Sequence, residues 1–258
     1  MIYTWDVGDF LTGNVFGFLL LFTRLGAACM LFPGVGESFV AARSRLMFAL
    51  LFTLLLFPVL GPSLPKMPDE ISRMVVLLAL EATIGVFLGM IVRLMVMALE
   101  FAGQAVALQL GIGNAFAFNP AMATQGSLPG ALMGLLGIVL IFASNLHHVF
   151  FAGLIKSYAL LPAGGLIEIK DMSETIVNTV RQSFAVSIMM AAPFFVLGIL
   201  LQVGLGLMAR LQPTLQVFFV ALPLQIMLGF AVFAILMGSM MAFWLDQTAD
   251  SYISIGLG

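Results

Sequence analysis

Long apolar runs, separated by short breaks that contain proline and glycine, dominate the chain. The runs fall at about 10–32, 46–60, 74–99, 128–161, 184–208 and 215–245. All are longer than the roughly ten residues of a membrane-barrel strand, and none alternates apolar and polar positions with a period of two. Proline and glycine follow several runs, where helices commonly stop. The pattern predicts an all-α, multi-helix protein with about six long hydrophobic helices.

The longest uncharged stretch contains the first candidate for a functional site. Aspartate, glutamate, lysine and arginine are all absent between Glu100 and Lys156. A membrane-crossing helix needs about 20 apolar residues, so this stretch must hold a helix, a connection and another helix. The connection, at 104–130, has glycine, proline and phenylalanine where a water-exposed loop would carry charge. Irregular backbone at membrane depth is tolerated where protein covers it or where it lines a cavity.

Composition supports a membrane-associated protein. The chain is 62% hydrophobic and 9% charged, against roughly 45–50% and about 25% in soluble domains. A net charge of −2 argues against a nucleic-acid or anionic-lipid surface role. Cys29 is the single cysteine, so no internal disulfide forms, and we expect a small buried hydrophobe there. The first ten residues lack the basic start of a cleaved signal, so the first run is expected to be retained.

A polar segment at 166–182 predicts an exposed amphipathic helix. It contains five charged residues within an otherwise apolar half of the chain. We expect it to divide a four-helix first part from a two-helix second part. The predicted domains are therefore 1–175, which includes the uncharged connection, and 176–258.

The basic residues do not fix an orientation. With six serial spans, one side would hold four lysines and arginines and the other five, which gives no positive-inside bias. Two interpretations stay open. Either Arg93 and Lys156 are assigned to the wrong side, or the helices do not thread the bilayer serially and pack mainly on partner protein.

Four charged residues fall inside apolar runs, where an ionisable group normally faces protein or water: Arg24, Glu81, Arg93 and Glu100. Arg93 and Glu100 lie two helical turns apart on one face, so direct pairing is marginal. Snorkelling from a helix end is the alternative for both. Arg24 stands nine residues before Pro33, too deep for easy snorkelling, and we favour a protein-facing site there.

Small-residue spacing predicts close helix packing at three places. The pairs are Gly13 with Gly17, Gly85 with Gly89, and Gly130 with Gly134.

Enzyme signatures are weak throughout. His147 and His148 are adjacent, so on a helix they point about 100° apart and cannot chelate one metal. Neither HExxH, a GxSxG elbow nor a phosphate-binding loop occurs. We expect no catalytic residue, metal or cofactor.

Several short motifs, taken in order, resemble the FliR family of flagellar export-gate proteins, whose relatives are the SctT/SpaR-type proteins of injectisomes. They are Arg24 with Phe32-Pro33-Gly34, Arg43-Ser44-Arg45-Leu46, Glu100 to Gln104, Gln109-Leu110-Gly111, Phe118-Asn119-Pro120, Ser157 to Gly164, Ala192-Pro193, and Arg210 to Phe218. The family commonly has Asp-Pro in place of Asn119-Pro120, a glutamine at Thr214 and a proline near Ala41.

The resemblance implies a gate without a catalytic step of its own. Such proteins assemble with FliP and FliQ, with an FlhB-type protein alongside, into a helical complex of the bacterial inner membrane and flagellar basal body. Its pore passes unfolded flagellar substrates. The first part of this chain would resemble FliP and the second part FliQ.

The loop at 111–126 would resemble the plug that closes this pore. Glycines permit unusual backbone angles, aromatic rings fill a lumen, and an Asn-Pro pair sets a turn. The expected plug residues are Gly111, Gly113, Phe116, Phe118, Asn119, Pro120 and Gly126. The expected subunit contacts are Arg24, Pro33, Arg210, Pro213 and Gln216.

Other functions stay open on the sequence. One alternative is an export-gate homologue of a virulence injectisome. A different class is a small-solute secondary transporter that uses Arg24, Glu81 and Arg93. A third is an assembly scaffold in which the loop is only a packed connector.

Overall fold

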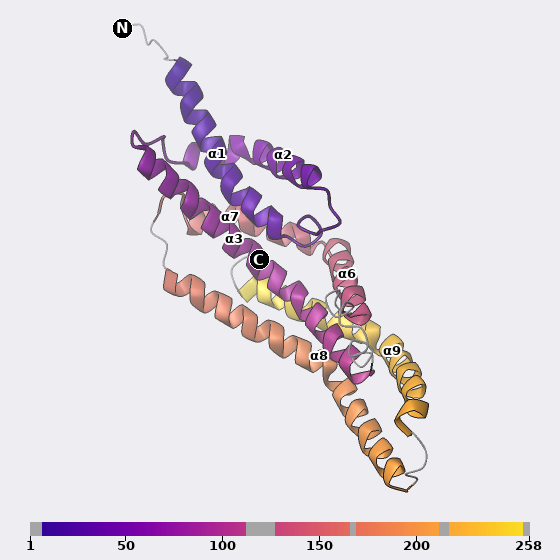
Figure 1. Ribbon diagram of the computed structural model, residues 1–258. Helices are drawn as coiled ribbons and strands as arrows, with labels where there is room; N and C mark the ends of the chain where they lie inside the picture. The colour runs from indigo at the N-terminus through magenta and orange to yellow at the C-terminus, as the bar shows by residue number, and fades with distance from the viewer. Residues whose placement is uncertain (1–6, 112–126, 166–168, 212–216, 255–258) are drawn as a thin grey trace, which may run out of the picture. The chain divides into compact units, whose positions relative to one another are not determined.

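The computed structural model describes residues 7–111, 127–165, 169–211 and 217–254, and this part of the chain is helical without a strand (Figure 1). The helices are α1 (Val7–Leu31), α2 (Ala42–Leu60), α3 (Ile71–Gln109), α6 (Leu128–Ala143), α7 (Leu146–Leu160), α8 (Ile169–Leu211) and α9 (Val217–Ser254), with a 3₁₀ turn, η1 (Gly61–Ser63), after α2. The predicted all-α class is confirmed.

By length and composition, five described helices suffice to cross a membrane, and six if α6 and α7 count as one broken span. The predicted number of about six is therefore confirmed.

The apolar run at 128–161 is broken in the middle. Asn145 adopts a left-handed conformation with φ of 61°, and α6 ends just before it. Asparagine tolerates this conformation better than other residues that have a β-carbon, because its short polar side chain bonds locally. One predicted helix is therefore two, since apolar periodicity alone does not register a single left-handed residue.

The polar segment at 166–182 is not a separate helix. From Ile169 it forms the beginning of α8, which continues without a break to Leu211. Neither glycine nor proline occurs between Ile169 and Pro193, so nothing stops the helix there. The charged side chains of Lys170, Asp171 and Glu174 are exposed as predicted. The domain boundary at 175 falls inside α8, and the division into two parts stays a prediction.

The chain forms two compact units that are discontinuous in sequence. One contains Met1–Leu94, His147–Asn178 and Tyr252–Gly258, and the other contains Met95–Leu146 and Thr179–Ser251. The helices α3 and α8 each contribute to both units.

In the first unit, α1 and α3 cross at very close range. A β-carbon at Gly85 would lie 2.2 Å from the carbonyl oxygen of Arg24, and one at Gly89 would lie 2.7 Å from that of Ala28. Only glycine permits backbones to approach so closely. The first unit also stacks Phe32, after α1, on Phe150 of α7, with ring centroids 4.4 Å apart. Cys29 is buried in this core as predicted.

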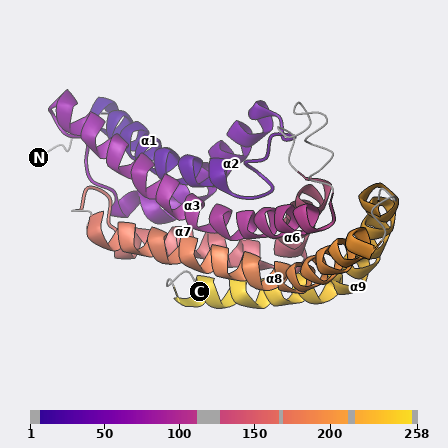
Figure 2. The ribbon, with the colours of Figure 1, turned by 60° about the horizontal axis from the view of Figure 1, so that its bottom comes forward.

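In the second unit, α8 and α9 run side by side and pack on the later half of α3 (Figure 2). The rings of Phe194 and Phe233 meet at 6.0 Å between α8 and α9. Trp244 of α9 is fully buried and donates its indole N–H to the carbonyl oxygen of Met95 at 2.8 Å. Ser183 of α8 also contacts the Met95 sulfur. Met95 is thus a shared attachment point for α8 and α9 on α3.

Candidate functional site

Only part of the predicted site falls within the described residues, namely Arg24, Pro33, Gly111 and Arg210. The other predicted site residues lie outside them: Gly113, Phe116, Phe118, Asn119, Pro120, Gly126, Pro213 and Gln216. Both ends of the uncharged loop are nevertheless described.

Gly111 marks the first end of the loop, where α3 stops. Its φ of +78° is left-handed, and its N–H donates to the carbonyl oxygen of Leu108 at 3.2 Å. This is the usual helix termination in which a glycine takes the position after the C-cap. Gly111 is therefore required by local geometry, whatever its role in a plug.

Ser127 marks the second end of the loop, where α6 begins. Its extended backbone and its hydroxyl, which accepts from the N–H of Gly130 at 3.1 Å, form a regular N-cap. Pro129 in the first turn of α6 loses nothing by lacking an N–H. The prediction of a connection over 104–130 is wrong at its start, because α3 continues to Gln109, and α6 begins at Leu128, two residues before the predicted end.

The start of α6 is pressed against the last turns of α3. A β-carbon at Gly103 would lie 2.4 Å from the Cα of Gly130, so these two glycines let the backbones touch. Gly134 lies one turn further along α6. A β-carbon there would lie 3.1 Å from Cγ of Glu100. Both ends of the loop are consequently held at the last turns of α3.

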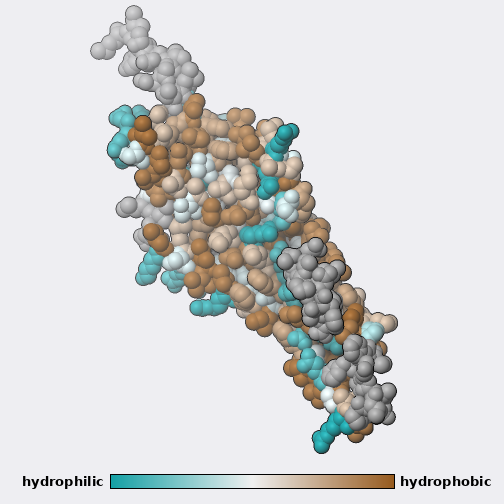
Figure 3. Space-filling model, viewed as in Figure 1, coloured by the Kyte–Doolittle hydropathy of each residue, from teal (hydrophilic) through white to brown (hydrophobic). Residues whose placement is uncertain are grey.

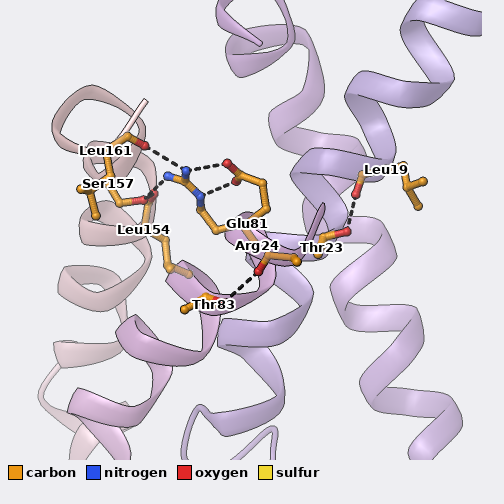
Figure 4. A network of polar contacts seen from close by, with 9 residues as sticks. Leu19, Thr23, Arg24, Glu81, Thr83, Leu154, Ser157 and Leu161 are labelled. Carbon is orange, nitrogen blue, oxygen red and sulfur yellow. Dashed lines mark hydrogen bonds and ion pairs between the residues drawn. The ribbon is translucent and has the colours of Figure 1, made fainter. Parts of the chain in front are cut away.

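A second cluster of polar groups surrounds Arg24 in the first unit (Figure 4). Its guanidinium makes a two-pronged ion pair with Glu81 of α3, with nitrogen to oxygen distances of 2.6 and 2.9 Å. It also donates to the hydroxyl of Ser157 at 3.2 Å and to the carbonyl oxygen of Leu161 at 2.9 Å. The ring of Tyr158 lies 4.0 Å from the guanidinium carbon.

The two charges of this cluster are paired with one another inside the protein. Arg24 and Glu81 are both fully buried, and two buried charges are tolerated only when geometry is good and further hydrogen bonds satisfy them. Leu161 follows α7, whose C-terminal carbonyls carry partial negative charge that a cation stabilises. Arg24 therefore ties α1, α3 and the end of α7 together.

The protein-facing environment predicted for Arg24 is confirmed, and the protein it faces is its own chain. Sequence reasoning noted Glu81 separately and did not pair the two, and it missed Ser157 and Leu161 as partners. The sequence signal for these two partners is the Ser157 to Gly164 motif, one of the motifs that carry the family resemblance and the one that contains both residues. A contact of Arg24 with another subunit stays a prediction.

Pro33 is buried in the turn that follows α1. The turn is shaped by Gly34, at φ of 91°, and by the N–H of Gly36, which donates to the carbonyl oxygen of Phe32 at 2.8 Å. Further along this turn, Glu37 accepts a hydrogen bond from Arg93 of α3. The alternative in which Arg93 snorkels from a helix end is wrong, because α3 continues for more than four turns beyond it and Glu37 pairs with it.

Arg210 is exposed in the last turn of α8. A cation there is favoured by the partial negative charge of the helix C-terminus. Its exposure leaves it accessible to another subunit. The predicted subunit contact stays a prediction.

The described residues contain no group of three or more histidine, cysteine, aspartate or glutamate side chains placed to hold a metal ion. His147 and His148 follow one another in α7, with ring centroids 4.1 Å apart.

Comparison with known proteins decides the family. The sequence profile of the bacterial export proteins, family 1, matches residues 15–251, nearly the whole chain. The chain belongs to this family. The flagellar biosynthetic protein FliR of Caulobacter vibrioides is 33% identical over 228 residues, which cover 88% of this chain and 91% of that protein. FliR of Bacillus subtilis is 29% identical over 226 residues, 85% of each chain.

The family also reaches beyond flagella. The Yop proteins translocation protein T of Yersinia pestis is 24% identical over 224 residues, 85% of each chain. The predicted resemblance to the FliR family is thus confirmed, and the chain is a membrane-embedded component of a type III export apparatus.

Proposed function

We propose that this FliR-family chain is a subunit of the flagellar export gate in the bacterial inner membrane. It would form, with FliP-like and FliQ-like subunits and an FlhB-like protein alongside, a pore for unfolded flagellar substrates. It would carry out no catalytic step. The flagellar role is favoured over an injectisome role by the higher identity to flagellar relatives.

The observation that carries the proposal is the length and exposure of the long helices. With 39, 43 and 38 residues, α3, α8 and α9 are each about 57–65 Å long at 1.5 Å per residue. The hydrocarbon core of a bilayer is only about 30 Å thick. Helices of this length exceed a simple crossing and need other protein to cover the excess.

Much of the surface of these helices is apolar and exposed within the chain. Only 33% of the most apolar window of α8 and 22% of that of α9 is buried within the chain. Side chains such as Val203 and Ile235 are 66% and 79% exposed. Figure 3 shows apolar side chains over much of the visible face. Continuous apolar surface of this extent is typical of an interface with protein or lipid. Partner helices in a multi-subunit gate would supply such cover, which also explains the undecided charge count.

The uncharged loop is our candidate for the seal of this pore. Its ends are held at the last turns of α3, while the intervening residues carry no charge and include Phe116 and Phe118. Uncharged aromatic side chains exclude water and ions without favouring one substrate sequence. Gly113, Gly126 and the turn at Asn119-Pro120 would let the loop move aside.

The predicted division into two parts, which is itself part of this proposal, implies the same partners. Residues 176–258 consist mainly of the long antiparallel helices α8 and α9, as expected for a two-helix FliQ-like part. Residues 1–175 hold the remaining helices and the loop, as expected for a FliP-like part. Pro213 and Gln216 would shape the turn between α8 and α9 at a subunit contact.

A solute transporter is the less supported class. Its candidate charges are already used within the chain, because Arg24 pairs with Glu81 and Arg93 with Glu37. Charges that already pair with one another leave no free group for a solute. Solute uptake by the purified, reconstituted chain alone would reverse this preference.

Deleting residues 113–123 tests the seal. We expect raised ion leak or unregulated secretion, because the aromatic bulk is lost while both helix ends are kept. A matched variant replaces the same residues with an equal number of glycine and serine residues, which preserves the connection. Leak is measured in cells and in vesicles that contain the assembled complex, with copurification of the partner subunits as the assembly control. Unchanged leak and unchanged export in an assembled deletion variant would refute the proposal.

A further inference from the structure

The last turn of α3 is held by α8 and α9 through contacts to which the function proposed above assigns no role. Gln225 of α9 donates its side-chain N–H to the carbonyl oxygen of Gln109 at 2.9 Å. That carbonyl is one of the last four of α3, which have no donor within their own helix. A residue of α9 therefore completes the hydrogen bonding of the end of α3.

Two glycines, one in α8 and one in α9, leave room for the side chains at the end of α3. A β-carbon at Gly229 of α9 would lie 2.0 Å from Cδ2 of Leu110, and one at Gly198 of α8 would lie 2.1 Å from Oε1 of Gln109. Gly198 and Gly229 are both buried. Gln225 and Gly229 are one helical turn apart and share a face of α9. The two helices thus present matched recesses to two consecutive residues of α3.

The Gln225 amide also lies beside the point where the helix becomes the loop. A β-carbon at Gly111 would lie 3.4 Å from its nitrogen, and Gly111 has φ of +78°. The hydrogen bond, the two recesses and the glycine turn therefore meet within three consecutive residues of the chain.

We propose that Gln225, Gly198 and Gly229 form an anchor, the α3 anchor, which fixes the start of the uncharged loop and stays closed during export. Opening it would expose Leu110, now 1% exposed. It would also leave the Gln109 carbonyl and the Gln225 amide without partners in an apolar environment, which is unfavourable. During export, α3 therefore stays in place up to Gly111. The role of the loop in this inference rests on the function proposed above.

A disulfide tests whether the α3 anchor exists in the assembled complex and stays closed. A β-carbon at Gly229 would lie 3.6 Å from that of Leu110, within the roughly 3.5–4.5 Å of disulfides. Leu110→Cys with Gly229→Cys, in a Cys29→Ala background, should oxidise in the assembled complex. Loss of maleimide-reactive thiols after denaturation measures the bond. Leu110→Cys with Gly238→Cys is the control, because no atom of the described residues lies within 4 Å of a β-carbon at Gly238.

We expect the oxidised Leu110→Cys/Gly229→Cys complex to secrete as well as the reduced one. Absence of the crosslink in the assembled complex would overturn the anchor. If secretion stops on oxidation and returns with reductant, the claim that the anchor stays closed during export is wrong. A crosslink that forms while loop deletion changes neither leak nor export would refute the proposed seal and leave the anchor standing.

A steric pair tests the effect on the loop. Gly229→Ala pushes against the buried Leu110 and should raise resting ion leak on the order of tenfold. Adding Leu110→Ala restores the space and should return the leak close to the wild-type level. Gly238→Ala, on the same helix but against open space, should leave it unchanged. Unchanged leak for Gly229→Ala, in a complex whose loop deletion does leak, would overturn the anchor's control of the loop.

Discussion

At the scale of single residues, the pair of Arg24 and Glu81 gives a direct test of how the first unit is held together. Removing either partner leaves the other charge buried, which typically costs about 3–5 kcal/mol. Arg24→Met and Glu81→Gln should therefore each lower the thermal unfolding midpoint of the purified complex substantially.

The double variant Arg24→Met with Glu81→Leu should be more stable than Arg24→Met alone, because no charge stays unpaired in the core. Thr83→Ala is the control, since its exposed hydroxyl bonds only to Ala79 of its own helix. A double variant less stable than both single variants would contradict this account and point to a need for the charges themselves.

The sequence located Arg24 correctly but did not identify its partners. Its depth before Pro33 is a local property, visible in one apolar run. Its pairing with Glu81 spans 57 positions, and the bond to Leu161 spans 137. No rule of sequence spacing predicts pairs that are so far apart in the chain, because they depend on how three helices pack. The same holds for Gln225 and Gln109, which are 116 positions apart.

At the scale of helices, three glycine pairs with identical spacing have different surroundings. Gly85 and Gly89 meet the backbone of α1, and Gly130 meets the backbone of α3. Among the described residues, a β-carbon at Gly13 would have no neighbour within 4 Å, and one at Gly17 would make ordinary contacts at 3.6 Å. The prediction of close packing is therefore confirmed within the chain for two pairs, and for Gly13 with Gly17 it stays a prediction.

Gly85→Ala and Gly13→Ala test this difference. At Gly85 the nearest atom is a backbone oxygen, which cannot move aside, so we expect a loss of roughly 1–3 kcal/mol. Gly13→Ala should be neutral or slightly stabilising, because alanine favours a helix by up to about 1 kcal/mol over glycine. Thermal unfolding of the two purified variants measures both. Equal effects would show that the close crossing of α1 and α3 is absent.

Helix boundaries divide into those that the sequence determines locally and those it does not. The end of α3 at Gly111 and the start of α6 at Ser127 follow from glycine and N-cap preferences. The break at Asn145 does not, because asparagine adopts the left-handed conformation only in some contexts. The continuity of α8 through its charged beginning does not follow from polarity either, because charged residues alter the exposure of a helix but do not end it where glycine and proline are absent.

At the scale of the whole molecule, a single chain leaves long apolar helices without cover. We therefore expect partner subunits to bind the exposed surface, and Arg210 is the predicted contact at the end of α8. Arg210→Ala should reduce copurification of a FliQ-like subunit on the order of tenfold, as for a central arginine of an interface.

Arg181→Ala is the matched control, because Arg181 is another exposed arginine of α8. It should leave recovery of the complex unchanged. Equal recovery for both variants would move the contact away from Arg210. Equal losses would indicate that basic charge along α8 matters, and that no specific site does.

The all-α membrane class of the protein was predictable because the hydrophobicity of many residues contributes to it. The way the protein assembles with partners was not predictable. Apolar runs identify helices of spanning length, but lipid and partner helices present equally apolar surroundings to residues such as Val203. The balanced count of basic residues is the sequence feature that left non-serial insertion open as one of two interpretations.

The uncharged stretch between Glu100 and Lys156 has one more physical consequence. A membrane voltage does work on a moving group in proportion to its charge, about 2.3 kcal/mol per elementary charge per 100 mV. The loop, the end of α3 and all of α6 carry no formal charge, so their displacement gains almost nothing from the field. Any voltage dependence of this protein must arise from charged groups elsewhere in the assembly or on the passing polypeptide.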